Sequence, residues 1–321
     1  MTARVLEAVP NFSEGRDLGV LRAIVDAVEH AGARVLDASA DPDHNRSVVT
    51  FIGEPVTVED AALAAARVAV ETIDLRTHEG VHPRIGALDV LPFVPLSGLT
   101  LSDACVVAHR AGDRLAAELG LPVFYYGEAS QPRGRGLAEL RRGGFEQLVD
   151  AWPADRQPDR LPTDWSRPGA HPSAGAVCVG ARDLLLAWNV VVDHIPVDTA
   201  SAIAAQLRES GGGVPGLRAL ALELPRRNAV QISMNLEDVE RAAPMEVFRL
   251  LERAIAEAGG RVRETEVIGL IPDRLLADAA ADRLRMDRSA EPRMLSRRLA
   301  EYLAERADDG SAAATPGSRM Q

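Results

Sequence analysis

Residues 78–96, HEGVHPRIGALDVLPFVPL, place two histidines directly before an apolar run. The first five letters satisfy the zinc-protease pattern H-E-x-x-H, which works only when both histidines share one face of a helix. Glycine inside a helix costs about 1 kcal/mol relative to alanine, so Gly80 disfavours a helix here. Pro83 pushes the preceding His82 toward an extended backbone. The stretch therefore predicts a rigid loop followed by a buried strand over 85–96.

Short apolar runs and amphipathic stretches alternate on both sides of this loop. The order predicts an α/β protein of the α+β type, with mixed sheets and helices packed on one face of each sheet. A proline-rich stretch, 152–175, fits no regular element and separates two such units. The expected strands are 4–12, 33–39, 47–53, 85–96, 121–129, 175–181, 184–193, 217–224, 229–237 and 261–272, and the expected helices are 17–31, 56–74, 101–119, 197–210 and 245–259.

Some finer features are also predicted from single residues. Asp17 and Ser102 are the expected N-caps of their helices, since short polar side chains accept from the first free backbone N–H groups. Pro92 and Pro95 are expected to break the buried strand that contains them. The second unit is expected to begin with strand 175–181, which gives it the order β-β-α-β-β-α-β.

Composition excludes several functional classes. All 36 basic residues are arginine, so a Schiff-base lysine and a P-loop lysine are absent. The net charge of −11 disfavours a general nucleic-acid binder. The two cysteines, Cys105 and Cys178, are far apart and form no metal-binding pair. No apolar leader or membrane-spanning run is found, and a cytoplasmic protein is expected.

Polar residues gather in the loops between the predicted elements, where ligands of α/β proteins bind. His82 is the main candidate, as a general base that works near neutral pH, with His78 in a supporting role. The alternative for each histidine is an ordinary loop residue. The other polar candidates are Asn11, Asn45, Arg46, Arg84, Glu128 and Asn189, and no metal site is predicted.

Six motifs give the chain a resemblance to a known family. The motifs are VPNFSEGR, HNRSVVTFIG, HEGVHPRIGALDVLPFVPL, LPVFYYGEA, VGARDLLLAWNVVV and ETEVIGLIP. In their order and spacing they resemble glutamate formiminotransferase, over about residues 5–275. The chain is similar to a stand-alone transferase, without the cyclodeaminase domain that follows in vertebrate enzymes.

The resemblance implies a ligand cleft between the sheets of two subdomains, in a homodimer. The subdomains would be 1–182 and 183–281, and residues 282–321 would be a partly disordered extension. The implied reaction moves a formimino group from N-formiminoglutamate to N5 of tetrahydrofolate and releases glutamate, in histidine degradation and one-carbon metabolism. No metal is implied.

Residue by residue, the resemblance makes His82 the catalytic base. It places the folate-contacting loop in about Pro162 to Gly175, with Pro162, Thr163, Pro172 and Gly175 as the expected folate contacts. For the substrates that it implies, the polar candidates Asn11, Asn45, Arg46, Arg84, Glu128 and Asn189 are the expected binding residues, with Arg46 and Arg84 for the carboxylates of glutamate and of the folate tail. Three alternatives stay open: formyl transfer between 5-formyltetrahydrofolate and glutamate, a non-catalytic folate-binding protein, and a metal-dependent hydrolase through His78 and His82.

Overall fold

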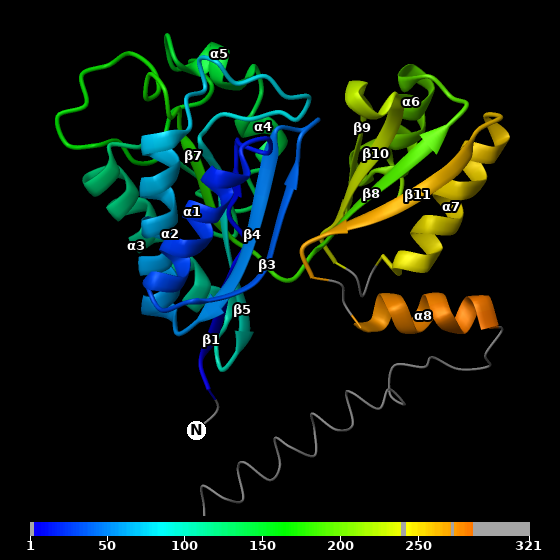
Figure 1. The fold of residues 1–321 in the computed structure, drawn as a ribbon, viewed down its shortest axis with the longest axis horizontal. Coiled ribbons are helices and arrows are strands. Elements are labelled where there is room, and N and C mark those ends of the chain that lie inside the picture. Colours follow the sequence, from blue (N-terminus) through cyan, green and yellow to red (C-terminus); the bar gives the residue numbers. More distant parts are fainter. Residues whose placement is uncertain (1–2, 239–241, 271–272, 285–321) are drawn as a thin grey trace, which may run out of the picture.

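The computed structural model describes residues 3–238, 242–270 and 273–284, and it contains two β-sheets that face each other. Helices cover the outer face of each sheet, so the sheets lie between two helical layers (Figure 1). The first sheet is built from Val5–Ala181 and the second from Leu186–Ile268. This arrangement confirms the predicted α/β fold class with two subdomains. The first sheet is mixed, as predicted, whereas the second is purely antiparallel.

The first sheet has seven strands in the order β1-β4-β2-β5-β7-β6, with β3 paired to the outside of β4. β5, β7 and β6 are parallel, and the remaining pairs are antiparallel. The strands are β1 (Val5–Ala8), β2 (Asn11–Phe12), β3 (Arg34–Asp41), β4 (Arg46–Gly53), β5 (Leu88–Ser97), β6 (Val123–Gly127) and β7 (Val177–Ala181). The turn between β3 and β4 carries the polar residues 41–46 to one end of the sheet.

Three helices, α1 (Leu18–His30), α2 (Pro55–Thr72) and α3 (Leu101–Leu119), cover one face of this sheet. Their buried side chains are mainly alanine, valine and leucine, as the low aromatic content predicts. The Asp17 side chain caps α1 by accepting from the backbone N–H of Gly19, which confirms that prediction. The Ser102 prediction is wrong: Thr100 caps α3 in a capping box with Asp103, and this places Ser102 inside the helix.

β5 runs unbroken through Pro92 and Pro95, contrary to the sequence prediction. Proline has no backbone N–H to donate to a neighbouring strand, but its carbonyl can still accept. The Pro92 carbonyl accepts from the backbone N–H of Val9. Pro95 pairs with Leu6 beside a shift in register, where one donor can be spared. The strand therefore continues despite both prolines.

The opposite face of the first sheet is partly covered by α4 (Leu137–Leu140) and α5 (Gly144–Leu148). Leu140 and Leu148 pack there against Phe124 of β6. The proline-rich stretch that follows contains no helix or strand, as predicted, and ends by pairing beside the loop that precedes β5.

The second sheet has four antiparallel strands in the order β11-β8-β10-β9. They are β8 (Leu186–Asp193), β9 (Leu217–Leu224), β10 (Ala229–Leu236) and β11 (Arg261–Ile268), and α6 (Val197–Leu207) and α7 (Pro244–Glu257) cover their outer face. The prediction that strand 175–181 starts this unit is wrong. As β7, it pairs with β5 and β6, because its buried side chains complete the first core.

Helix α8 (Asp273–Leu284) follows the second sheet. Most of the predicted extension, 285–321, lies outside the described residues, so its expected disorder stays a prediction. Among the residues that are described, no helix is long and apolar enough to cross a membrane.

Candidate active site at the histidine loop

The two histidines of the opening motif lie in a loop between α2 and β5, which we call the His loop (residues 73–87). The loop is not helical, as Gly80 and Pro83 predict. A Cβ atom on Gly80 would lie 2.3 Å from the carbonyl oxygen of His44, so only glycine allows this close packing. On the other side, the Ser13 hydroxyl donates to the Gly86 carbonyl over 2.7 Å. The loop is therefore held from both sides.

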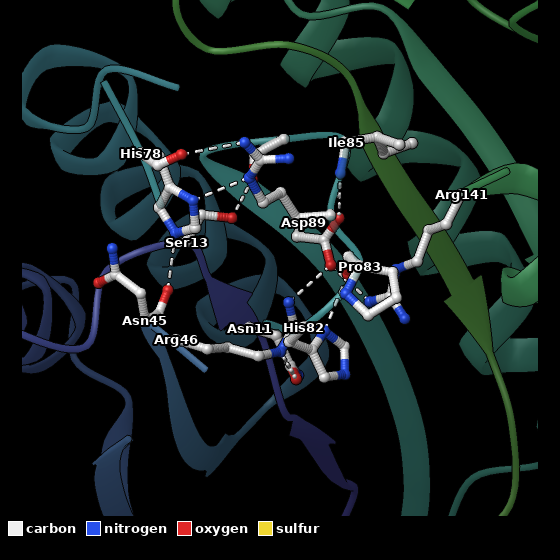
Figure 2. A network of polar contacts seen from close by, with 12 residues as sticks. Asn11, Ser13, Asn45, Arg46, His78, His82, Pro83, Ile85, Asp89 and Arg141 are labelled. Atoms are coloured by element: carbon white, nitrogen blue, oxygen red, sulfur yellow. Dashed lines mark hydrogen bonds and ion pairs between the residues drawn. The ribbon is translucent and has the colours of Figure 1, made fainter. Parts of the chain in front are cut away.

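His78 has both ring nitrogens occupied (Figure 2). Its Nε2 lies 2.8 Å from the Asn45 carbonyl, which can only accept, so Nε2 carries the proton. Its Nδ1 accepts from Nε of Arg84 over 2.8 Å. Burial lowers the pKa of His78, in keeping with a neutral ring. This histidine supports the loop, and neither nitrogen is available for a proton transfer.

His82 has one free ring nitrogen. Its Nδ1 lies 2.8 Å from the Pro83 carbonyl and must donate to it, which leaves the proton on Nδ1. Within the described residues, Nε2 has no hydrogen-bond partner, and its lone pair can accept a proton. Burial and the nearby charges of Arg46 and Arg141 hold the pKa of His82 well below its usual range. The ring is therefore neutral at neutral pH, as a general base requires.

A buried ion cluster lies beside His82 and consists of Arg46, Asp89 and Arg141 (Figure 2). The Asp89 side chain is fully buried, and its carboxylate accepts from Arg46 over 2.7 Å, from Arg141, and from the backbone N–H of Ile85 over 2.8 Å. Burial alone would raise the pKa of Asp89, but the two guanidinium groups outweigh burial and hold this pKa well below its usual range. The carboxylate is therefore ionised.

The ion cluster has a surplus of one positive charge, since two guanidinium groups meet one carboxylate. Burial lowers the pKa of Arg46 to about 10, so this residue stays protonated at neutral pH. Nε of Arg141 is buried without a hydrogen-bond partner in the described part of the chain. An unpaired buried N–H is costly unless a ligand satisfies it. The cluster can accordingly bind an anionic group next to the free nitrogen of His82.

The structure brings Asn11 and Arg46 together at this site: Nε of Arg46 donates to the Asn11 side-chain oxygen over 3.2 Å. Asn45 is used internally, because its oxygen accepts from Gly15 and its nitrogen donates to the Glu79 carbonyl. Arg84 forms an ion pair with Glu146 over 2.7 Å. The Glu146 side chain is 66% exposed, so water screens this pair and Arg84 can exchange partners.

Two predicted residues lie further from His82. Glu128 directly follows Gly127, the last residue of β6, and so lies at the carboxyl ends of the parallel strands. The His loop precedes Leu88, the first residue of β5, and so lies at their amino ends. Asn189 lies on β8 and is buried. It is on the face of the second sheet that looks toward the first, because its neighbours Trp188 and Val190 pack on the helices.

The predicted folate residues divide into two pairs. Pro172 and Gly175 belong to a short segment that pairs with the His loop, where the backbone N–H of Leu75 donates to the Ser173 carbonyl. Gly175 fits against the carbonyl of Ile85, and a Cβ atom there would approach it to 2.0 Å. Pro162 and Thr163 lie earlier in the same stretch, and Thr163 is exposed.

Asp89 and Arg141 were missed in the sequence, and so was the role of His44, whose ring centroid lies 5.6 Å from that of His82. A lone aspartate inside the apolar run GALDVLPF was the available signal for Asp89, since a buried carboxylate needs a countercharge. Arg141 gave no such signal, because its partner lies 52 positions away in the sequence.

Polar groups without partners also lie between the two sheets. The hydroxyl of Thr50 on β4 and the side-chain oxygen of Gln231 on β10 are buried and unpaired among the described residues. A separate cavity of about 440 Å³ lies at the ends of β8 and β10, where Asp193 is already paired with Arg263. No cluster of metal-ligating side chains occurs in the part of the chain that is described.

Comparisons with known proteins give matches over most of the chain. Residues 5–182 match the family model "Formiminotransferase domain, N-terminal subdomain", and residues 187–290 match "Formiminotransferase domain". The glutamate formimidoyltransferase of Thermoplasma acidophilum is 37% identical over 92% of this chain and 97% of its own length. That of Streptococcus pyogenes serotype M1 is 36% identical over 87% and 92%. The formimidoyltransferase-cyclodeaminase of Sus scrofa is 41% identical over 87% of this chain, which spans 52% of that protein.

Proposed function

The chain belongs to the formiminotransferase family, and from that premise we propose that it transfers a formimino group from N-formiminoglutamate to N5 of tetrahydrofolate and releases glutamate. It is then a glutamate formimidoyltransferase, an enzyme of histidine degradation and one-carbon metabolism. One observation carries the proposal. A neutral His82 has a free Nε2 beside a buried cluster with surplus positive charge.

In the proposed reaction, His82 moves one proton. Its Nε2 accepts the proton that N5 of tetrahydrofolate loses as N5 bonds to the amidine carbon of the donor. His82 then returns this proton to the glutamate nitrogen, as the bond between that nitrogen and the amidine carbon breaks. One proton is taken and one is given back, so the residue is regenerated. A positioned base of this kind contributes about 10²–10⁴-fold to the rate.

The ion cluster supplies the binding charge. Arg46 and Arg141 together hold one more positive charge than Asp89 neutralises, which suits a carboxylate of the glutamate donor. Arg84 can join them by leaving its exposed partner Glu146. Asn11 holds Arg46 in place, and Asn45 holds the loop. Asn189 of β8 remains a proposed substrate contact, whereas the position of Glu128, beyond the far end of β6 and away from His82, does not support the contact expected for it.

The residues between the sheets fit tetrahydrofolate as the acceptor. The unpaired Thr50 hydroxyl and Gln231 oxygen are buried on facing sheets and suit the polar edge of a pterin ring. Tetrahydrofolate would supply N5 as the nucleophile. Pro172 and Gly175 lie beside the His loop, and Pro162 and Thr163 lie in the same proline-rich stretch; all four are proposed folate contacts.

Three further proposals concern the whole protein. We propose a subdomain boundary near Arg182, with the first subdomain over 1–182, the second over 183–281 and an extension over 282–321; the short connection between β7 and β8 supports this boundary. We propose a homodimer, as the resemblance implies, and light scattering of the purified chain tests it. We propose a cytoplasmic location, which fractionation of the source cells tests.

Turnover of N-formiminoglutamate with tetrahydrofolate by the purified chain tests the proposed reaction. We expect equal amounts of glutamate and 5-formiminotetrahydrofolate to form. Parallel incubation of 5-formyltetrahydrofolate with glutamate decides whether the transferred group is formyl. If the chain binds tetrahydrofolate but converts neither substrate pair, it is a folate-binding protein and not a transferase.

A further inference from the structure

The turn between β3 and β4, residues 41–46, connects the two subdomains. The side-chain oxygen Oδ1 of Asp43 accepts from the backbone N–H of Arg226 over 2.9 Å. His44 and Gln231 lie 187 positions apart in the sequence, and Nε2 of Gln231 lies 3.1 Å from Nε2 of His44. Both partners of the turn belong to β10 or to the short 3-10 turn before it. The second sheet therefore contacts the first sheet through this turn.

The same turn also holds the His loop. The backbone N–H of Val81 donates to the Asp43 carbonyl over 3.2 Å, and Asn45 donates to the Glu79 carbonyl over 3.0 Å. Gly80 packs directly on the carbonyl of His44. The turn is thus packed between the His loop on one side and β10 on the other. Because only this turn lies between them, a movement of β10 would also move the residues that contact the His loop.

The contact between His44 and Gln231 fixes the protonation of His44. Both side chains are buried, with Gln231 fully so. In the observed orientation the amide N–H of Gln231 donates and one oxygen, Oε1, stays unpaired. An amide nitrogen carries N–H donors and no acceptor, so in this orientation the His44 ring nitrogen that faces it has to accept. Nε2 of His44 is therefore the acceptor, its proton lies on Nδ1, and the ring is neutral.

The charges around His44 come from three elements. Burial lowers the pKa of His44, as does Arg46 of β4. Asp41 and Asp43 of its own turn raise this pKa, and so does Glu266 of β11. His82 faces His44 at 5.6 Å between ring centroids, with the two planes tilted by 38°. A charge on His44 would therefore act directly on the ring that the proposed reaction uses.

We propose that Gln231 of the second subdomain is a positioning residue for His82 and acts through His44. Its amide holds the His44 ring neutral and in place, and the His82 ring lies against that ring. The proposal rests on the proposed function and deepens it, because it makes the base depend on the docking of the second sheet. His82 is then correctly placed only while β10 contacts the turn.

A double-mutant cycle tests the coupling. Gln231→Met removes the donor at nearly the same shape, and His44→Phe keeps a ring but removes the acceptor. We expect either change to lower kcat up to roughly tenfold, which is what the loss of one hydrogen bond allows, with the KM for N-formiminoglutamate changed less. The double variant should be no slower than either single variant, because the pair acts as a unit. Gln206→Met makes the same chemical change on the exposed face of α6 and should leave kcat unchanged.

The pH profile separates positioning from a merely structural role. In Gln231→Met, His44 loses the donor that keeps Nε2 unprotonated, and the acid limb of kcat should move because His82 lies against that ring. The proposal would be overturned if the two single substitutions lowered kcat additively in the double variant. It would also be overturned if Gln231→Met lowered the unfolding midpoint but left the acid limb of the kcat–pH profile unmoved. If Gln231→Met does not fold, nitrogen NMR of the wild-type chain decides. A proton on Nδ1 of His44 at neutral pH supports the proposal, and a proton on Nε2 overturns it.

These measurements also distinguish the failure of the proposal from the failure of the proposed function. A wild-type chain without any turnover contradicts the transferase. The NMR pKa of His82, compared between the wild type and Gln231→Met, still tests the coupling in that case. An unchanged pKa of His82 would then overturn the positioning role by itself.

Discussion

The two ends of the seven-stranded sheet carry different chemistry. At the amino ends of the parallel strands β5, β6 and β7 lie the His loop and the buried ion cluster of Arg46, Asp89 and Arg141. At the carboxyl ends, Glu128 and Arg133 form a partly exposed ion pair over 3.7 Å. Open α/β sheets usually bind ligands beyond the carboxyl ends of their strands. In this protein the buried polar cluster lies at the other end.

Three separate segments bring the cluster to this end. β4 begins at the same end where β5 begins, so Arg46 and Asp89 meet there. The segment after β6 then returns across the sheet through α4, and Arg141 just beyond it reaches Asp89. The position of the cluster therefore follows from the starts of β4 and β5 and from the returning segment after β6, and it departs from the general rule.

Replacing His82 should have the largest effect. We expect His82→Ala to lower kcat by about 10²–10⁴-fold, because no other free ring nitrogen in the described site can replace Nε2. Steady-state turnover measures the change. His30→Ala, an exposed histidine on α1, is the matched control and should retain full activity. A similar loss of kcat in both variants would contradict a catalytic role for His82 at the amino ends of the parallel strands.

Removing the carboxylate of the ion cluster should mainly reduce stability. Asp89→Asn leaves two buried guanidinium groups uncompensated, and we expect the free energy of unfolding to fall by about 3–5 kcal/mol. Denaturant unfolding measures this quantity. Asp74→Asn breaks an exposed pair with Arg76 and should leave the unfolding midpoint almost unchanged. Equal effects of the two substitutions would mean that Asp89 has no special structural role.

The smallest effect is a shift in pH dependence. The charge of Arg141 helps to lower the pKa of His82, so Arg141→Met should raise this pKa toward the ordinary value of 6.5. Activity requires the neutral ring, and the acid limb of kcat/KM should therefore move to higher pH. Its midpoint is read from a pH series. A shift to lower pH would contradict the proposed direction of the charge effect.

The local features of the sequence predicted the local structure. Gly80 and Pro83 predicted the non-helical His loop, and Asp17 predicted the start of α1, because each acts on its own backbone. The Thr100 cap was missed because Ser102 carries the same chemistry two positions later. The assignment of β7 failed since a short apolar strand carries no information about which sheet it joins.

The cluster around His82 was only partly predictable. Arg46 could be predicted because it lies in a polar turn between two strands. Arg141 and Gln231 lie far from their partners in the sequence, and their contacts depend on how α4 and β10 pack. Such contacts follow from tertiary structure, and no spacing in a single sequence encodes them. Asp89 lies between these cases, since its charge in an apolar run signals that an unidentified partner exists.

The state of the His82 ring tests the central claim most directly. Long-range proton–nitrogen NMR of the histidine rings, assigned with the His82→Ala variant, reports the tautomer and the pKa of this residue across a pH series. The structure predicts a proton on Nδ1, an unprotonated Nε2 at neutral pH, and a pKa below 6.5. A proton on Nε2 at neutral pH, or a pKa at or above 6.5, would contradict the assignment of His82 as the base.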